Sequence, residues 1–138
     1  MFRSAPAVAK ERPLTRRGSV GILRACPPRY NASSVEPVFH YVVVRADLPR
    51  GIQAANIIHA SGESSPGNLS PGTHAVCLVV PDEPALRAVA TKLEAHACRF
   101  APIVETDAPF GGQLMAIGCV PAGKEVLKRA LSALPLLR

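Results

Sequence analysis

The chain has 138 residues, enough for one domain with a hydrophobic core but too few for two. Hydrophobic residues make up 48% of it and aromatic residues only 4%, with no Trp, so Val, Leu, Ile and Ala must form the core. No apolar run approaches the ~20 residues that a membrane-spanning helix needs, which leaves a soluble α/β protein as the expectation.

The formal charge of +6 is unevenly distributed along the sequence. Residues 1–36 hold seven basic and two acidic residues and so carry +5 of this charge, whereas residues 37–138 hold nine basic and eight acidic residues. The second segment is therefore nearly neutral, and its bulk charge does not indicate a nucleic-acid surface. Any phosphate binding there must come from the local placement of basic side chains.

Residues 1–36 are predicted to be a disordered tail, because they contain four prolines, scattered arginines and no sustained apolar period. An Arg-rich segment that contains Ser and few acids is also typical of an organelle transit peptide, and a linker or an over-extended translation start would look the same. The absence of an apolar h-region argues against secretion. We expect a cytoplasmic protein, or an organellar one if the tail is a transit peptide.

The folded domain is predicted to begin at residue 37 with a strand. "VFHYVVVRA" (38–46) is almost continuously apolar and β-branched, which favours a central strand that is covered on both faces. "DLPRG" turns the chain into a helix of roughly residues 52–61, and the Gly- and Pro-rich residues 62–73 are predicted to form a loop. "HAVCLVV" (74–80) indicates a second buried strand.

A second helix follows Asp82, which is placed to act as its N-cap. Strands are then predicted at 98–105 and 113–120, separated by the loop "TDAPFGG" (106–112), and "GKEVLKRALSAL" gives a last amphipathic helix. The order βαβαββα predicts one α/β domain, a four-stranded mixed sheet flanked by helices. The alternation favours mostly parallel pairing, with one antiparallel hairpin across the loop 106–112.

Metal binding is not expected from the cysteines and histidines. The cysteines stand singly at 26, 77, 98 and 119 without a CxxC pair, and the histidines at 40, 74 and 96 lack metal-ligand spacing. Those cysteines that fall in or beside predicted strands are interpreted as small buried hydrophobic residues.

The first helix carries a group of polar residues on one predicted face. At about 100° per residue, Asn56, His59 and Glu63 share a narrow arc, while Ala54, Ile57, Ile58 and Ser61 would pack on the sheet. The alternative is an ordinary solvated helix face, and a helix that ends at Gly62 would move Glu63 off it.

Other polar residues follow the ends of predicted strands, where ligands collect in α/β sheets. Arg45, Asp47 and Arg50 follow the first strand, and Asp107 follows the third. His59 and Asp107 would make an acid/base pair if they met. Taken alone, Asp107 is better explained as a turn residue.

Four blocks of the sequence resemble, in order, the type 2 peptidyl-tRNA hydrolase family, over roughly residues 40–138. They are "YVVVRADL", "GIQAANIIHA", "VVPDEPALRAVATKL" and "DAPFGGQLMAIGCVP". The matching positions include Arg45, Asp47, Leu48, Gly51, His59, Pro81, Asp82, Glu83, Asp107 and Gly118. The resemblance implies a compact α/β domain with a four-stranded mixed sheet. It also implies hydrolysis of the ester between a peptide and the 3′ end of tRNA, without a metal or organic cofactor.

The sequence departs from the family pattern at several positions. The family's helix-opening Lys is Ile52 here, its Gln is Asn56, and Gln113 stands where a Thr opens the last strand. A second family Thr, after the Asp-Ala pair, is absent. A Lys that would hold phosphate or stabilise negative charge is thus missing, and Arg45 or Arg50 could substitute for it.

The leading hypothesis is an esterase that acts on peptidyl-tRNA. His59 would activate a water molecule and Asp107 would orient it or its partner, as the catalytic residues. The substrate would be bound by Arg45, Asp47, Arg50, Asn56, Glu63 and Gln113. The alternatives are a non-catalytic relative that binds tRNA or a protein, and a plain structural domain. No membrane contact is expected, and the sequence leaves open whether the protein is a homodimer.

Overall fold

The computed structural model describes residues 36–138, so the predictions for residues 1–35 lie outside its described part. The elements are β1 (Val38–Arg45), α1 (Arg50–Ser64), β2 (His74–Val80), α2 (Glu83–Ala95), β3 (Phe100–Val104), β4 (Leu114–Cys119), β5 (Ala122–Gly123) and α3 (Lys124–Leu131). This is the predicted βαβαββα order with one short strand, β5, added before the last helix. The predicted α/β class is confirmed.

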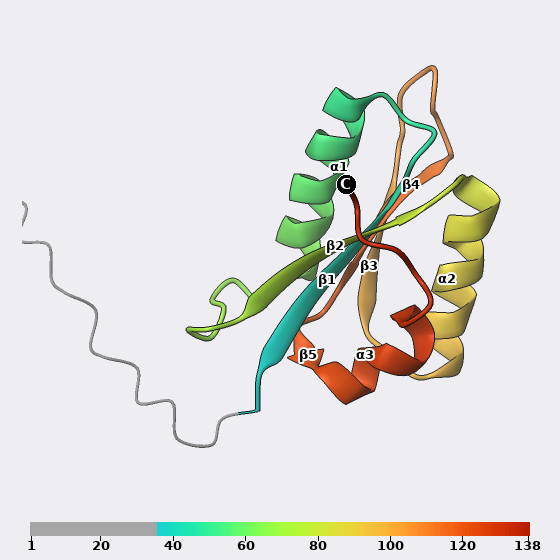
Figure 1. The fold of residues 1–138 in the computed structure, drawn as a ribbon. Helices are drawn as coiled ribbons and strands as arrows, with labels where there is room; N and C mark the ends of the chain where they lie inside the picture. Colours follow the sequence, from blue (N-terminus) through green and yellow to red (C-terminus); the bar gives the residue numbers. More distant parts are fainter. Residues whose placement is uncertain (1–35) are drawn as a thin grey trace, which may run out of the picture. The chain divides into compact units, whose positions relative to one another are not determined.

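The strands form one mixed sheet in the order β2-β1-β4-β3, with β5 beside the start of β1 (Figure 1). β1 and β2 are parallel, whereas β4 is antiparallel to both β1 and β3. The hairpin across the loop 106–112 is confirmed, but the expectation of a mostly parallel sheet is wrong, since β1–β2 is the one parallel pair among these strands. The crossover between them places the N-terminus of α1 at the carboxyl end of β1.

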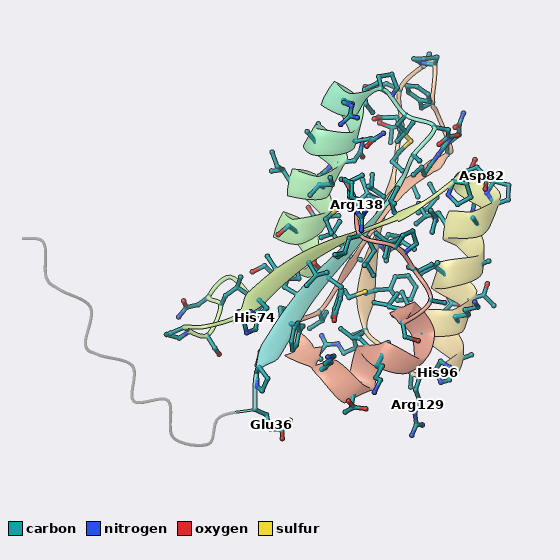
Figure 2. The ribbon with its side chains drawn as sticks, viewed as in Figure 1. Glu36, His74, Asp82, His96, Arg129 and Arg138 are labelled. Atoms are coloured by element: carbon teal, nitrogen blue, oxygen red, sulfur yellow. The ribbon has the colours of Figure 1, made fainter. Side chains whose placement is uncertain are left out.

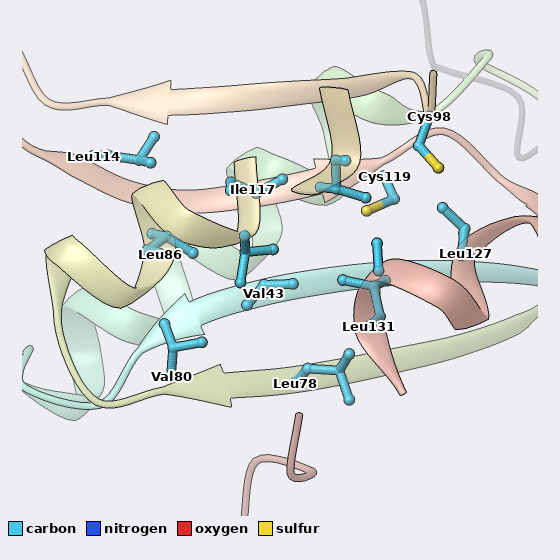
Figure 3. Packing of buried hydrophobic residues seen from close by; sticks show 13 residues of the cluster. Val43, Leu78, Val80, Leu86, Cys98, Leu114, Ile117, Cys119, Leu127 and Leu131 are labelled. Atoms are coloured by element: carbon cyan, nitrogen blue, oxygen red, sulfur yellow. The ribbon is translucent and has the colours of Figure 1, made fainter. Parts of the chain in front are cut away.

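β1 is buried on both faces, which explains its continuous apolar sequence. Val42 and Val44 pack toward α1 in a cluster with Ala60, whereas Val43 packs on the other face with residues of α2 and α3. Figure 3 shows Leu86 of α2 close to Val43 within this second cluster. The N-cap prediction for α2 is also confirmed, because Asp82 accepts a hydrogen bond from the backbone N–H of Ala85 at 2.9 Å.

The predicted faces of α1 are wrong by about one residue. The helix does not end at Gly62 but continues to Ser64, and its buried residues are Asn56, Ala60 and Ser64. Ile58, which was expected in the core, is 74% exposed. A polar residue and small residues thus face the sheet while an isoleucine faces solvent.

The close approach of α1 to β4 explains this rotation. A Cβ added to Gly118 would collide with the backbone oxygen of Ala60 and lie 2.5 Å from Ser64 Oγ. Only small side chains fit where the two backbones come so close, and this requirement outweighs the burial of Ile58. His40 of β1 lies under the same helix, with Nε2 2.7 Å from Ser64 Oγ.

Residues after α3 run along the outer edge of β2 toward α1 (Figure 1). Leu136 forms a bridge with Leu78, and two backbone hydrogen bonds of 3.0 Å flank it, from Val79 N–H to Pro135 and from Leu137 N–H to Cys77. We call residues 132–138 the C-terminal segment. It protects part of an edge strand that would otherwise expose unpaired backbone groups.

The cysteines within the described residues agree with the sequence interpretation. Cys98 and Cys119 are buried and Cys77 is partly buried, all as free thiols. Burial raises the pKa of the Cys119 thiol to about 12, so this side chain behaves as a small hydrophobic group. None of the helices in residues 36–138 is long and apolar enough to cross a membrane.

Candidate functional site

A polar cluster lies at the carboxyl end of β1 and is centred on Arg45. This residue is only 6% exposed. Its guanidinium donates from Nε to Asp47 Oδ1 at 2.9 Å and from Nη2 to Asp47 Oδ2 at 2.7 Å. Nη1 donates to Gln113 Oε1 at 2.8 Å and lies 3.9 Å from Glu83 Oε2. Three segments that are far apart in the sequence therefore meet at one side chain, which we call the Arg45 cluster.

Glu83 and Arg87 extend the Arg45 cluster along the first turns of α2. Glu83 Oε1 accepts from the Leu114 N–H at 3.0 Å and from Arg87 Nε at 2.9 Å. Sequence reasoning did not select these two residues for the site. Their i, i+4 spacing on a predicted helix was the available signal for the pair, but nothing in it showed that the pair would face Arg45.

The charges of the Arg45 cluster balance one another. The hydrogen bonds from Arg45 lower the pKa of the Asp47 carboxyl. The backbone N–H of Leu114, followed by Arg87, lowers the pKa of Glu83. Asp47 and Glu83 are thus held as carboxylates, which makes them weak proton acceptors. Since Arg45 is buried and its donors are taken by Asp47, Gln113 and Leu114, it is better suited to positioning its neighbours than to binding a phosphate.

Gln113 is the residue of the Arg45 cluster whose side-chain amide still has unpaired hydrogen-bond donors within the described part of the chain. Because Arg45 takes Oε1 of its amide, the two hydrogens on Nε2 point elsewhere, and they have no hydrogen-bond partner within residues 36–138. Gln113 also closes the loop after β3, where its N–H donates to Phe110 O at 2.9 Å and the Phe110 N–H donates to Asp107 O at 3.1 Å. Asp107, which is exposed, therefore belongs to the same compact loop as Gln113.

The structure does not join His59 to Asp107. Neither a hydrogen bond nor an ion pair connects them, and His59 instead lies 3.8 Å from Glu63 on an exposed surface of α1. His59 is nine residues beyond the start of α1, about 13 Å along a helix that runs away from the carboxyl end of β1. Asp107 lies in the loop at that end. The direction of the crossover helix separates the two residues that were expected to form an acid/base pair.

Asn56 does not share a face with His59, contrary to the sequence prediction. It is 7% exposed, lies between α1 and the sheet, and donates from Nδ2 to the backbone oxygen of Ile52 at 3.0 Å. The predicted arc of three polar residues is therefore divided, with His59 and Glu63 outside and Asn56 inside.

A groove of about 810 Å³ opens beside the N-terminus of α1, between the β1–α1 turn, β2 and the C-terminal segment. Arg50, Gln53 and Arg138 supply its polar side chains, while Leu48, Val79 and Leu137 are among the apolar ones. Gln53 fixes the turn, because its Nε2 donates to Leu48 O at 2.6 Å and to Ala46 O at 3.2 Å. This residue was also missed, since its hydrogen bonds go to backbone groups.

The position of the groove agrees with the general rule that ligands bind beyond the carboxyl ends of parallel strands. Arg50 is exposed and forms no ion pair within residues 36–138, so it is available to a ligand. We find no group of three or more His, Cys, Asp or Glu side chains in this part of the chain that could hold a metal ion.

Comparisons with known proteins give little further information. No family model and no curated protein matches the sequence. A solved structure of a protein of unknown function from Agrobacterium tumefaciens strain C58 is similar, with a TM-score of 0.49 and 14% sequence identity. The alignment covers 75% of this chain and 100% of that one.

Proposed function

We propose that the chain is a divergent relative of the type 2 peptidyl-tRNA hydrolases and hydrolyses the ester between a peptide and the 3′ end of tRNA. One observation carries this proposal. Arg45 contacts Asp47, Glu83 and Gln113, which belong to three of the four sequence blocks that resemble the family. Blocks that are separate in sequence but share one cluster at a ligand-binding edge are expected of a functional site.

The chemistry is assigned to the loop that contains Asp107 and Gln113. In this proposal Asp107 accepts a proton from water as the water oxygen attacks the ester carbonyl carbon. Gln113 donates a hydrogen bond from Nε2 to the carbonyl oxygen as negative charge develops on it. The bond from the carbonyl carbon to the ribose 3′ oxygen then breaks, and that oxygen receives the proton.

Arg45 acts as a positioning residue in this scheme. It turns the amide of Gln113 so that Nε2, rather than Oε1, faces outward. His59 has no part in the reaction, because it lies on α1 about 13 Å from the helix start. This revises the hypothesis drawn from the sequence, in which His59 activated the water.

The test is hydrolysis of N-blocked aminoacyl-tRNA by the full-length chain and by three variants. Asp107→Ala and Gln113→Ala are expected to lower kcat at least tenfold, which corresponds to about 1.4 kcal/mol of barrier. His59→Ala is the matched control on an exposed surface and is expected to retain activity within twofold. A large loss in His59→Ala with normal activity in Asp107→Ala would refute this assignment and restore the histidine hypothesis.

A second function, binding of tRNA without hydrolysis, is favoured by one observation. Glu105 Oε1 accepts the backbone N–H groups of Thr106 and Asp107, whereas the carboxylate of Asp107 has no side-chain partner within residues 36–138 that would orient it toward a substrate. A parent chain that binds tRNA but gives no turnover would identify the protein as such a binding module.

A further inference from the structure

The basic residues of the described domain are segregated on its surface, although its net charge is close to zero. Three neighbouring grooves surround the C-terminal segment, with volumes of about 810, 480 and 290 Å³. Five of the nine basic residues between positions 37 and 138 line them: Arg50, Lys92, Lys124, Lys128 and Arg138. None of the eight acidic side chains in the same range does so.

The three grooves form one band along the outer side of β2. The first and second share Val79 and Pro135, the second and third share Leu134, and the first and third share Leu136. We call this surface the basic band. It runs from Arg50, at the N-terminus of α1, to Lys124, which follows the β5 residues paired with the start of β1.

Four of the five basic side chains of the basic band have no ion-pair partner within residues 36–138. Arg50, Lys92, Lys124 and Arg138 are exposed and form no ion pair with a carboxylate of residues 36–138. Lys128 lies 3.5 Å from Glu125, but both side chains are exposed, so that pair is weak. Asp82 stands near the second groove, where its carboxylate caps α2.

The length of the basic band fits a polyanion better than a small ligand. Between Arg45 and Val38 the β1 strand rises seven residues, about 23 Å, and the band follows this direction. A nucleic-acid backbone presents phosphates at intervals of a few ångströms and can therefore meet several of these basic groups at once. The apolar floors of the grooves accommodate the aliphatic parts of the lysine side chains.

We propose that the basic band binds the phosphate backbone of the tRNA whose 3′ end reaches the candidate site, and so extends the site along β2 and the C-terminal segment. This inference rests on the proposed function for the identity of the partner. It assigns the tRNA to this side of the sheet and away from the exposed surface of α1 that carries His59 and Glu63.

The test compares two double variants of the full-length chain that remove the same charge. Lys92→Ala/Lys124→Ala removes two charges from the band. Arg99→Ala/Arg129→Ala removes two exposed charges outside it; Arg99 lines a separate groove, and Arg129 lies on α3 (Figure 2). Thermal unfolding of both variants checks that they fold, and the basic residues of 1–36 are the same in both.

Binding of deacylated tRNA is then measured as a function of salt concentration. The band variant is expected to bind at least fivefold more weakly than the parent at about 0.1 M salt. The slope of log affinity against log salt should become less negative by about 2, at roughly 0.9 per lost phosphate contact. The control variant should stay within twofold of the parent.

Hydrolysis separates this inference from the function on which it rests. The band variant is expected to raise KM for N-blocked aminoacyl-tRNA and to leave kcat unchanged. Asp107→Ala should instead lower kcat and leave KM unchanged. The band would be overturned if both double variants weakened tRNA binding equally, or if neither weakened it. Turnover by the parent would still support the hydrolase in that case. Weak binding confined to the band variant, with no turnover in the parent, would support the band and refute the hydrolase. A parent that neither binds nor hydrolyses would overturn both.

Discussion

Arg45 and Asp47, two residues apart in the sequence, are joined by two parallel hydrogen bonds of 2.9 and 2.7 Å between guanidinium and carboxylate. The pair is asymmetric, since the side chain of Arg45 is 7% exposed and that of Asp47 is 41% exposed. Asp47 can therefore regain water if it loses its partner, whereas Arg45 cannot. The stability of this edge of the sheet depends on the arginine more than on the aspartate.

Replacement of Arg45 should destabilise the domain. Arg45→Ala removes the donors to Asp47 and Gln113 and leaves a cavity beside Leu114, and we expect the free energy of unfolding to fall by about 3 kcal/mol. Arg45→Lys keeps the charge but cannot make the two-pronged contact, so it should fall between the parent and the alanine variant. Urea denaturation measures both. A loss below about 0.5 kcal/mol in Arg45→Ala would mean that the Arg45 cluster is not a structural centre.

The Arg45–Asp47 pair should also appear in the acid stability of the domain. Because the pKa of Asp47 is lowered in the folded state, the unfolded chain takes up the proton first as the pH falls. The contribution of Asp47 is complete above the ordinary pKa of an aspartate, about 3.9, and is lost as the pH falls through the lower folded value. Urea midpoints for the parent and Asp47→Asn should converge below about pH 4. A constant difference between them down to pH 2.5 would show that the carboxylate is not ion-paired.

His40 is expected to add a second pH dependence near neutrality. Its side chain is buried with Nε2 against Ser64 Oγ, and burial lowers the pKa of this imidazole. The single hydroxyl hydrogen of Ser64 goes to Ala60 O at 2.7 Å, so neutral His40 carries its own hydrogen on Nε2.

The sign of this dependence follows from the lowered pKa. Between the folded pKa and the ordinary value of about 6.5, only the unfolded chain binds the proton, so stability decreases as the pH falls through that range. Urea denaturation at pH 7.5, 6.5 and 5.5 should show this decrease in the parent, and a smaller one in His40→Gln. Identical pH slopes in the two proteins would contradict the burial of a neutral imidazole.

Two glycine substitutions should have opposite effects on stability. Gly118→Ala places a methyl group against Ala60 and Ser64 of α1, where it cannot fit unless the helix shifts, and we expect a loss of about 2–3 kcal/mol. Gly62→Ala is the matched control within α1, since its added Cβ meets nothing within 4 Å. There a gain of up to about 1 kcal/mol is expected from the better helix propensity of Ala. Thermal unfolding of both variants tests the close contact between α1 and β4.

The sequence alone was enough to predict the fold class and every helix and strand except the short strand β5. Continuous apolar runs such as residues 38–46, glycine- and proline-rich loops, and the cap at Asp82 are local signals, and they lie within about two residues of element boundaries in the structure. The pairing of β4 was harder to predict. Strand-helix alternation favours parallel neighbours, but β4 lies between β1 and β3 and is antiparallel to both.

The candidate site was predicted only in part. Arg45, Asp47 and Gln113 were each selected, yet their mutual contacts span 68 positions of the sequence and required the order of strands in the sheet. Glu83 belongs to the same cluster but was not selected, because its contact with Arg45 also depends on how distant segments pack together. His59 and Asp107 were paired because both followed strands, a pattern that carries no information about how far along its helix a residue lies.

The buried face of α1 is the clearest case of a feature that the local sequence could not predict. Periodicity assigned Ile57 and Ile58 to the core with equal weight, and only the absence of a side chain at Gly118 in another strand decided which residues could approach the sheet. The sequence by itself determined which segments become helices and strands, because hydrophobic period and capping act over a few residues. The tertiary structure decided which faces and charges meet, because packing and ion pairing depend on residues brought together from distant positions.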